Sequence, residues 1–153
     1  MNRKFFVSAI LGLFALILLY FQPYKLVVVV GNSMYPTLKN GQILLAKKID
    51  KIEKGDIVVL CPEVDNVIIK RVVYVPGDYY YVVYDHKNLD IILLDNNYKK
   101  MREYIEKFGH NGIFEYVIKP NYYFVVGDNR NDSDDSRRFG PVDKQYIMYK
   151  IVR

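Results

Sequence analysis

The sequence predicts a mainly β domain of sandwich or barrel type, preceded by a single N-terminal transmembrane helix. An uninterrupted apolar run fills residues 5–21, whereas from residue 25 onward short apolar stretches alternate with turn residues. Fifteen tyrosines and no tryptophan agree with a strand-rich body, because aromatic and β-branched side chains favour a pleated, half-buried surface. With 153 residues, the chain has room for one domain and a short additional element.

The first segment, residues 1–24, predicts a membrane anchor. Arg3 and Lys4 precede the apolar run at 5–21, whose length is at the lower end of the ~17–25 residues that cross a bilayer as a helix. A cleaved secretory signal is the alternative, but it needs small residues at a cleavage site, and the run ends among bulky aromatic residues. Because the positive charges precede the run, we expect a cytoplasmic N-terminus and a domain, residues 25–153, outside the cytoplasm.

The remainder reads as strands separated by turn residues, with Asn40-Gly41 as a strong tight-turn pair. One stretch has apolar residues on a single helical face, with Asn97 suited to begin the helix and Gly109 suited to end it. The sequence therefore predicts one short helix near residues 98–108, inside a variable insertion at 79–121. Strands are expected at 26–30, 42–47, 57–60, 67–75, 79–84, 91–94, 113–118, 122–126 and 146–152.

Charge and cysteine content exclude several kinds of partner. The net charge is +5, but the basic residues are dispersed and form no block interleaved with aromatics, so no nucleic-acid partner is expected. A mild attraction to the anionic surface of a lipid bilayer is the simpler interpretation. Cys61 is the only cysteine, which excludes an intramolecular disulfide and a cysteine-rich zinc site.

Ser33 is a candidate nucleophile. It follows the predicted strand at 26–30 and precedes Pro36, and a strand end exposes a side chain while leaving backbone N–H groups available. Taken alone, a serine between a glycine and a proline is more often a turn residue that bonds its own backbone. The assignment therefore depends on a suitable base.

Lys70 is the better candidate base, because the two histidines, His86 and His110, both lie around the predicted helical insertion. Strand alternation puts Lys70 on the same face as Ile68 and Val72. Burial among such residues lowers a lysine pKa from ~10.4, by up to ~3–5 units, so that the amine is partly neutral near neutral pH. The alternative is a surface lysine that keeps its charge in water.

The segment at 127–142 is rich in carboxylates and resembles a calcium loop at first sight. Its spacing differs from an EF-hand, since basic residues fall inside it and no bidentate glutamate closes it. A structural loop held by a charge pair between Asp135 and Arg137 explains the mixture better.

Together these segments resemble the sequence boxes of type I signal peptidases, membrane proteases that pair a serine with a lysine. The matching segments are 33–38 with the nucleophile, 54–59, 70–78 with the general base, and 127–142. The resemblance covers most of residues 26–142 and leaves about 79–121 unmatched. It implies a membrane-bound serine endopeptidase that removes N-terminal signal peptides from exported preproteins, without a metal or a cofactor.

The resemblance also implies roles for single residues. Ser33 would attack the scissile carbonyl, its backbone N–H would supply the oxyanion hole, and neutral Lys70 would take the proton. Ser133 would orient the Lys70 amine, while Gly31 occupies the position at which some family members add a hydroxyl donor. Support of the site is implied for Gly127, Asp135, Ser136 and Arg137, and substrate contact for Val28, Val30, Met34 and Ile68.

The implied substrates are preproteins with small residues one and three positions before the cut, extended between residues 26–30 and 67–70. Three alternatives stay open. A specialised relative would process a dedicated substrate such as a conjugative pilin. A self-cleaving repressor also pairs serine with lysine, but it needs a DNA-binding module where this chain has an apolar run. The third is a catalytically silent, membrane-tethered β module.

Overall fold

A computed structural model describes residues 3–20, 23–63, 66–85, 88–90, 102, 105–106 and 113–152. This part of the chain is mainly β, which confirms the predicted fold class. The helices are α1 (Arg3–Tyr20), α3 (Ser136–Phe139) and the 3-10 turn η2 (Lys144–Tyr146). The strands are β1 (Tyr24–Val28), β2 (Ile43–Lys48), β3 (Ile57–Glu63), β4 (Asn66–Tyr74), β5 (Tyr79–Asp85), β6 (Asn88–Asp90), β7 (Ile113–Val117), β8 (Tyr122–Val126), β9 (Val142–Asp143) and β10 (Ile147–Ile151).

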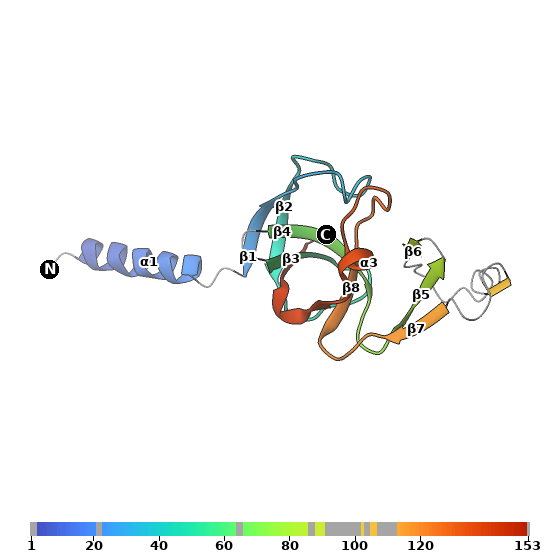
Figure 1. The fold of residues 1–153 in the computed structure, drawn as a ribbon. Coiled ribbons are helices and arrows are strands. Elements are labelled where there is room, and N and C mark those ends of the chain that lie inside the picture. Colours follow the sequence, from blue (N-terminus) through green and yellow to red (C-terminus); the bar gives the residue numbers. More distant parts are fainter. Residues whose placement is uncertain are drawn as a thin grey trace.

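Seven strands form one antiparallel sheet in the order β1-β2-β10-β3-β4-β8-β9, and they wrap around a common core (Figure 1). β4 is paired with β3 along one edge, from Asn66 opposite Glu63 to Arg71 opposite Ile57. Along its other edge β4 pairs with β8 only from Arg71 onward. Within the described residues, the edge of β4 at 66–70 therefore lacks a neighbouring strand on that side.

A smaller sheet, in the order β6-β5-β7, lies apart from the main one at the end opposite α1 (Figure 1). It belongs to the insertion that the sequence predicts at 79–121. The rings of Tyr80 and Tyr116 stack within this sheet, and the contact of Tyr80 with Phe124 of β8 connects the sheet to the body. The strand predicted at 91–94 and, apart from three helical residues at 102 and 105–106, the helix predicted near 98–108 lie outside the described residues.

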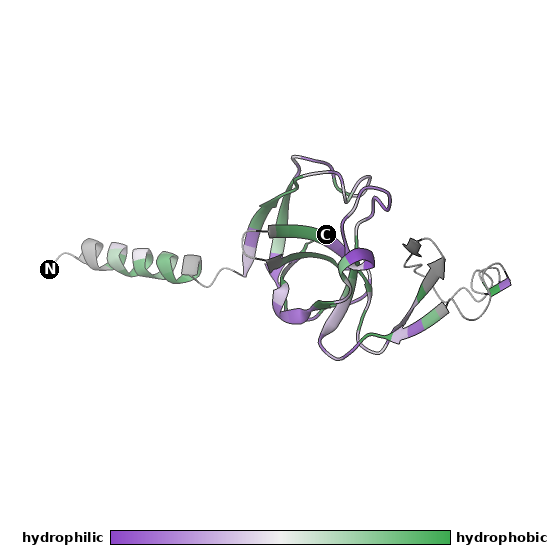
Figure 2. Cartoon of the chain, in the orientation of Figure 1, coloured by the Kyte–Doolittle hydropathy of each residue, from purple (hydrophilic) through white to green (hydrophobic). Residues whose placement is uncertain are grey.

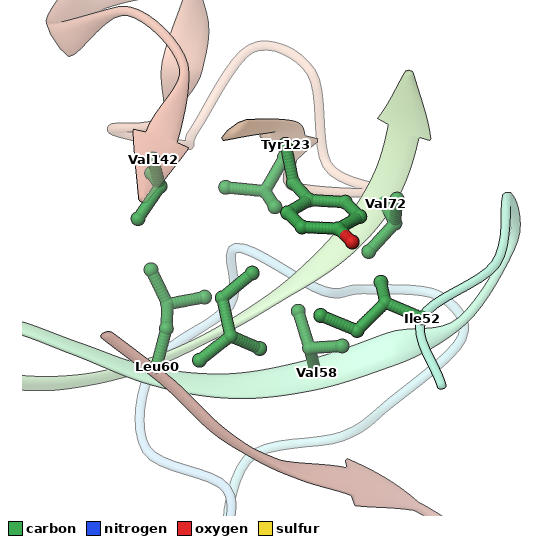
Figure 3. Close-up of a cluster of buried hydrophobic side chains, with 8 residues drawn as sticks. Ile52, Val58, Leu60, Val72, Tyr123 and Val142 are labelled. Carbon is green, nitrogen blue, oxygen red and sulfur yellow. The ribbon is translucent and has the colours of Figure 1, made fainter. Parts of the chain in front are cut away.

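Among the described residues, buried side chains form three clusters, and β3 contributes to the first two because its side chains alternate between the faces of the sheet. Figure 3 shows Tyr123 and Val142 facing Val58 and Leu60 in the first cluster. The first cluster comprises Ile52, Val58, Leu60, Val72, Tyr123, Val125, Val142 and Ile147. The second comprises Val29, Met34, Leu38, Ala46, Ile57, Val59 and Ile151. The third cluster comprises Tyr74, Ile118, Phe124 and Val126.

Helix α1 projects from the β body and is largely apolar along its described length (Figure 2). Its large apolar side chains are exposed, for example Leu11 at 62% and Leu16 at 65%. Within the described part of the chain, no helix combines the length and the apolarity that crossing a bilayer demands. The structure therefore gives no support to the predicted transmembrane helix.

Candidate active site

Ser33 lies in the loop between β1 and β2. Gly31 begins this loop at φ +87°, a conformation that glycine adopts without strain, and its N–H donates to Asn40 Oδ1 at 3.0 Å. Met34 and Leu38 point into the second core cluster and fix the loop to the body. Ser33, beside Met34, is left half-buried at the surface of the domain.

Strand β4 carries Lys70 to this loop. Lys70 Nζ donates to Ser33 Oγ at 2.8 Å, and Lys70 is only 4% exposed. Its strand neighbours on the same face behave as the sequence predicts, since Val72 belongs to the first core cluster and Ile68 packs against it. Burial lowers the pKa of the Lys70 amine, and the carboxylates of Asp135 and Asp134 oppose this effect without reversing it. The arrangement supplies a hydroxyl next to an amine that loses its proton more readily than an ordinary lysine.

Asp135 is the centre of the loop that follows β8, and it is fully buried. Arg137 approaches it with two nitrogens, Nε at 2.8 Å and a terminal nitrogen at 2.9 Å. Ser133 Oγ donates to the carboxylate at 2.7 Å and the Gly127 N–H donates to it at 2.9 Å. Burial raises the pKa of Asp135, but these hydrogen bonds, with Arg137 foremost, outweigh burial and hold the pKa below its ordinary value. The pair expected between Asp135 and Arg137 is therefore present.

Ser136, also fully buried, holds the loop to β8, because its Oγ accepts the Val125 N–H at 3.0 Å. Ser133 is placed differently from the role expected for it. Its hydroxyl donates to Asp135, and the hydrogen bond of the Lys70 amine goes to Ser33. The orienting contact between Ser133 and Lys70 stays a prediction.

Gly127 lies between the two serine-bearing segments. A Cβ placed on it would lie 2.2 Å from Ser133 Oγ and 2.5 Å from the backbone oxygen of Ser33. Both atoms therefore border the same small space, and only a glycine fits between them. Gly127 is a spacer that lets the Ser133 loop approach the nucleophile.

Sequence reasoning missed a second ion pair that supports the site. Arg71 binds Asp128 through Nε at 2.7 Å and a terminal nitrogen at 2.6 Å, and its other terminal nitrogen donates to the Gly55 carbonyl at 2.8 Å. Burial raises the pKa of Asp128, but hydrogen bonds from Arg71 and Thr37 prevail and keep it low. The two partners are 57 positions apart in the sequence, so no local pattern links them. The only available signal was that Arg71 directly follows Lys70 and Asp128 directly follows Gly127.

The residue after this aspartate, Asn129, ties the nucleophile loop in place. Its N–H donates to the Ser33 carbonyl at 2.9 Å, and its side-chain amide donates to the Asn32 carbonyl at 3.2 Å. Among the described residues, no hydrogen bond uses the backbone N–H of Ser33 itself. The carbonyl of Ser33 is thus anchored, whereas its N–H has no hydrogen bond within the described part of the chain.

The four residues expected to contact substrate do not share one surface. Val28 and Val30 are exposed at 55% and 87%, whereas Met34 is buried in the second core cluster. Ile68 packs against the first cluster. The residues that pack with Met34 are Val29 and Ile69, which directly follow the expected Val28 and Ile68. A shift of one residue along a strand moves a side chain to the other face of the sheet.

The chain is similar to a known protein family over nearly its whole length. The family model described as signal peptidase, peptidase S26, matches residues 2–152. Signal peptidase IB of Staphylococcus aureus is 35% identical over 144 residues, which cover 79% of this chain and 72% of the relative. Signal peptidase I S of Bacillus subtilis is 37% identical over 128 residues, covering 76% and 66%. The crystal structure of a signal peptidase I from Enterococcus faecalis shares 27% identity at a TM-score of 0.42, covering 68% of this chain and 99% of that one.

Proposed function

Because this chain belongs to the signal peptidase S26 family of serine endopeptidases, which remove signal peptides, we propose that it cleaves preproteins with Ser33 as nucleophile and Lys70 as general base. The observation that carries the proposal is the contact between Lys70 Nζ and Ser33 Oγ at 2.8 Å, made by a lysine that is 4% exposed. A buried amine with a lowered pKa is the form of lysine that accepts a proton near neutral pH.

The reaction follows from this contact. As Ser33 Oγ attacks the scissile carbonyl carbon, neutral Lys70 takes the hydroxyl proton, and the carbonyl oxygen becomes an oxyanion. The Ser33 backbone N–H donates to that oxyanion. The scissile C–N bond then breaks, Lys70 returns the proton to the leaving amine, and an ester to Ser33 remains. Water, deprotonated by Lys70, hydrolyses the ester and restores the serine.

Ser133 supports Lys70 in this scheme. Since Asp135 accepts the Ser133 proton at 2.7 Å, the Ser133 oxygen offers further partners only its lone pairs. When the lone pair of the neutral Lys70 amine points toward the hydroxyl proton of Ser33, the N–H groups of the amine need acceptors. The Ser133 oxygen can serve as one of them. Arg137 keeps Asp135 ionised and in position, and Ser136 fixes the loop to β8.

The substrate binds as an added strand. Two edges are available for it, the outer edge of β1, which ends the sheet, and the edge of β4 at 66–70. In an extended chain, side chains one and three positions before the cut point to the same side. Val29, Met34 and Ile69 pack together on one face. In this proposal the side chains at −1 and −3 point toward this apolar face, against which small residues fit.

The enzyme works at a lipid bilayer, with the N-terminus in the cytoplasm and the catalytic domain outside. The exposed apolar side chains of α1 favour insertion into lipid over contact with water. Leu26 of β1 at 75%, Val30 of the following loop at 87% and Ile43 of β2 at 66% are further exposed apolar side chains of the β body. Binding of the full chain to anionic vesicles in flotation, resistant to high salt, is the expected result. Flotation that high salt abolishes would contradict apolar insertion.

The decisive experiment compares cleavage of a preprotein carrying alanine at −1 and −3 by wild type, Ser33→Ala and Lys70→Ala. Both variants should lose at least about 1,000-fold in kcat, because the nucleophile and its base act as a unit. Lys119→Ala, which changes an exposed lysine on the connection between β7 and β8, is the matched control and should retain full activity. Unchanged processing by Ser33→Ala and Lys70→Ala would point to a silent module instead. A panel of unrelated preproteins distinguishes a general peptidase from one dedicated to a single substrate.

A further inference from the structure

A cleft of about 760 Å³ opens beside Lys70, within the size range of ligand sites. Lys70 and Ile68 of β4 form one end of it. Most of the remaining wall comes from the segment that runs from α3 through β9 to η2, including Phe139, Asp143 and Tyr146, and Tyr122 of β8 and Asp134 complete it. The catalytic amine therefore faces this cleft as well as Ser33.

The pairing of β4 determines which part of a substrate reaches the cleft. A substrate strand that pairs with the edge at 66–70 cannot continue along β4, because β8 occupies that edge from Arg71 onward. The substrate polypeptide must therefore leave the sheet at Lys70. The leaving amine has to reach Lys70 Nζ to receive its proton, so the residues that follow this amine begin at the mouth of the cleft.

We propose that this cleft binds the first residues of the mature protein, which follow the scissile bond; the inference rests on the proposed function. Two aromatic side chains, Phe139 at 45% exposure and Tyr146 at 40%, offer flat apolar contact to such a segment. They stand on α3 and η2, two short turns that bracket β9.

The charge of the cleft indicates which mature residues it prefers. At its rim Arg138 is paired with Asp134 at 3.0 Å, and Lys70 Nζ is engaged with Ser33 Oγ at 2.8 Å. Asp143 remains as a carboxylate without a basic partner among the ion pairs of the described residues, and it also accepts the Gln145 N–H at 2.9 Å. The cleft therefore favours basic over acidic residues in the first part of the mature chain.

The test uses two series of preproteins with alanine fixed at −1 and −3. One series carries lysine, alanine or glutamate at +2 to +4, and the other carries the same residues at −2 and −4. Wild type should show a higher kcat/KM for lysine than for glutamate in the first series. Asp143→Asn keeps an acceptor for Gln145 and should reduce that ratio by about fivefold, the size expected of one partly exposed charge contact. Asp50→Asn, on an exposed turn after β2, should leave it unchanged.

A second variant tests the aromatic wall. Tyr146→Ala should lower kcat/KM about tenfold for substrates with an aromatic residue at +2 to +4 and by a smaller factor for alanine substrates, whereas Tyr79→Ala on β5 should affect neither. If an active wild type cleaves the lysine and glutamate substrates of the first series equally well, this inference is overturned and the proposed function still stands. A response to Asp143→Asn confined to −2 and −4 would overturn it in the same way. A wild type that cleaves no substrate would overturn the proposed function, and this inference with it.

Discussion

Gly127→Ala is expected to inactivate the enzyme without removing any group that takes part in the chemistry. The added Cβ would lie 2.2 Å from Ser133 Oγ, 2.6 Å from Ser133 Cβ and 2.5 Å from the Ser33 carbonyl oxygen. Contacts of this length do not persist in proteins, so one of the two segments must move. The Ser33 oxygen is backbone, held by the Asn129 N–H at 2.9 Å, and cannot rotate out of the way.

The size of the effect follows from the distances. To restore ordinary contacts, the neighbours of the new methyl group must retreat by about 1 Å, and misplacement of that order costs about 100-fold in rate. The strain of an overfilled interior also lowers the free energy of unfolding by about 1–3 kcal/mol. We therefore expect kcat to fall about 100-fold, because both the Ser33–Lys70 contact and the Ser133–Asp135 contact depend on this spacing.

The assay is single-turnover cleavage of a preprotein at a temperature well below the midpoint of thermal unfolding, so that unfolded protein does not contribute to the loss. Gly12→Ala is the matched control, since a Cβ on Gly12 meets nothing within 4 Å. A rate for Gly127→Ala within threefold of wild type, in a folded protein, would refute the spacing argument.

Three further predictions concern titration and the ion pairs. The value of kcat/KM should rise with pH through the lowered pKa of Lys70, because only the neutral amine accepts the serine proton, and full activity at pH 5 would contradict this role. Asp135→Asn should lower the free energy of unfolding by about 3 kcal/mol at pH 7. Since the folded pKa of Asp135 is below 3.8, its stabilisation is complete above that value and is lost as the pH falls through the folded pKa, so denaturant midpoints of wild type and variant should converge in acid. Arg71→Lys cannot form the two-nitrogen contact with Asp128 and should lower the midpoint of thermal unfolding by several degrees; an unchanged midpoint would show that the pair adds nothing to stability.

Local patterns were sufficient to predict most strands of the body, although the two-residue strand β9 (Val142–Asp143) was missed because it is too short to show an alternation. The apolar run predicted at 67–75 became β4 (Asn66–Tyr74), and Asn40-Gly41 marks the turn before β2. The face that Lys70 shares with Ile68 and Val72 also follows from alternation alone. The proximity of Ser33 and Lys70 required more, because it depends on how the loop after β1 folds over β4, and the family resemblance supplied that step.

Other parts of the site depend on contacts that a sequence does not reveal. The strand predicted at 26–30 is β1 (Tyr24–Val28), and the chain turns inward at Val29, which moves the buried face by one residue. The partner of Ser133 depends on how its own loop folds, and this loop presents the Asp135 carboxylate, two positions away, to the Ser133 hydroxyl at 2.7 Å. The pair of Arg71 and Asp128 joins segments far apart in sequence, and neither residue carries a local pattern that signals it.

The unpaired edge of β4 has a consequence for self-association. An exposed strand edge is where folded proteins add strands from one another and begin to aggregate. Here the available edge is confined to residues 66–70, because β8 closes the rest of the strand from Arg71 onward. A second folded copy would gain only a few backbone hydrogen bonds there, too few to hold two rigid sheets together. A pliable polypeptide can follow the same short edge and then turn away, so this edge of β4 suits an extended peptide, such as the proposed substrate, better than a second folded copy.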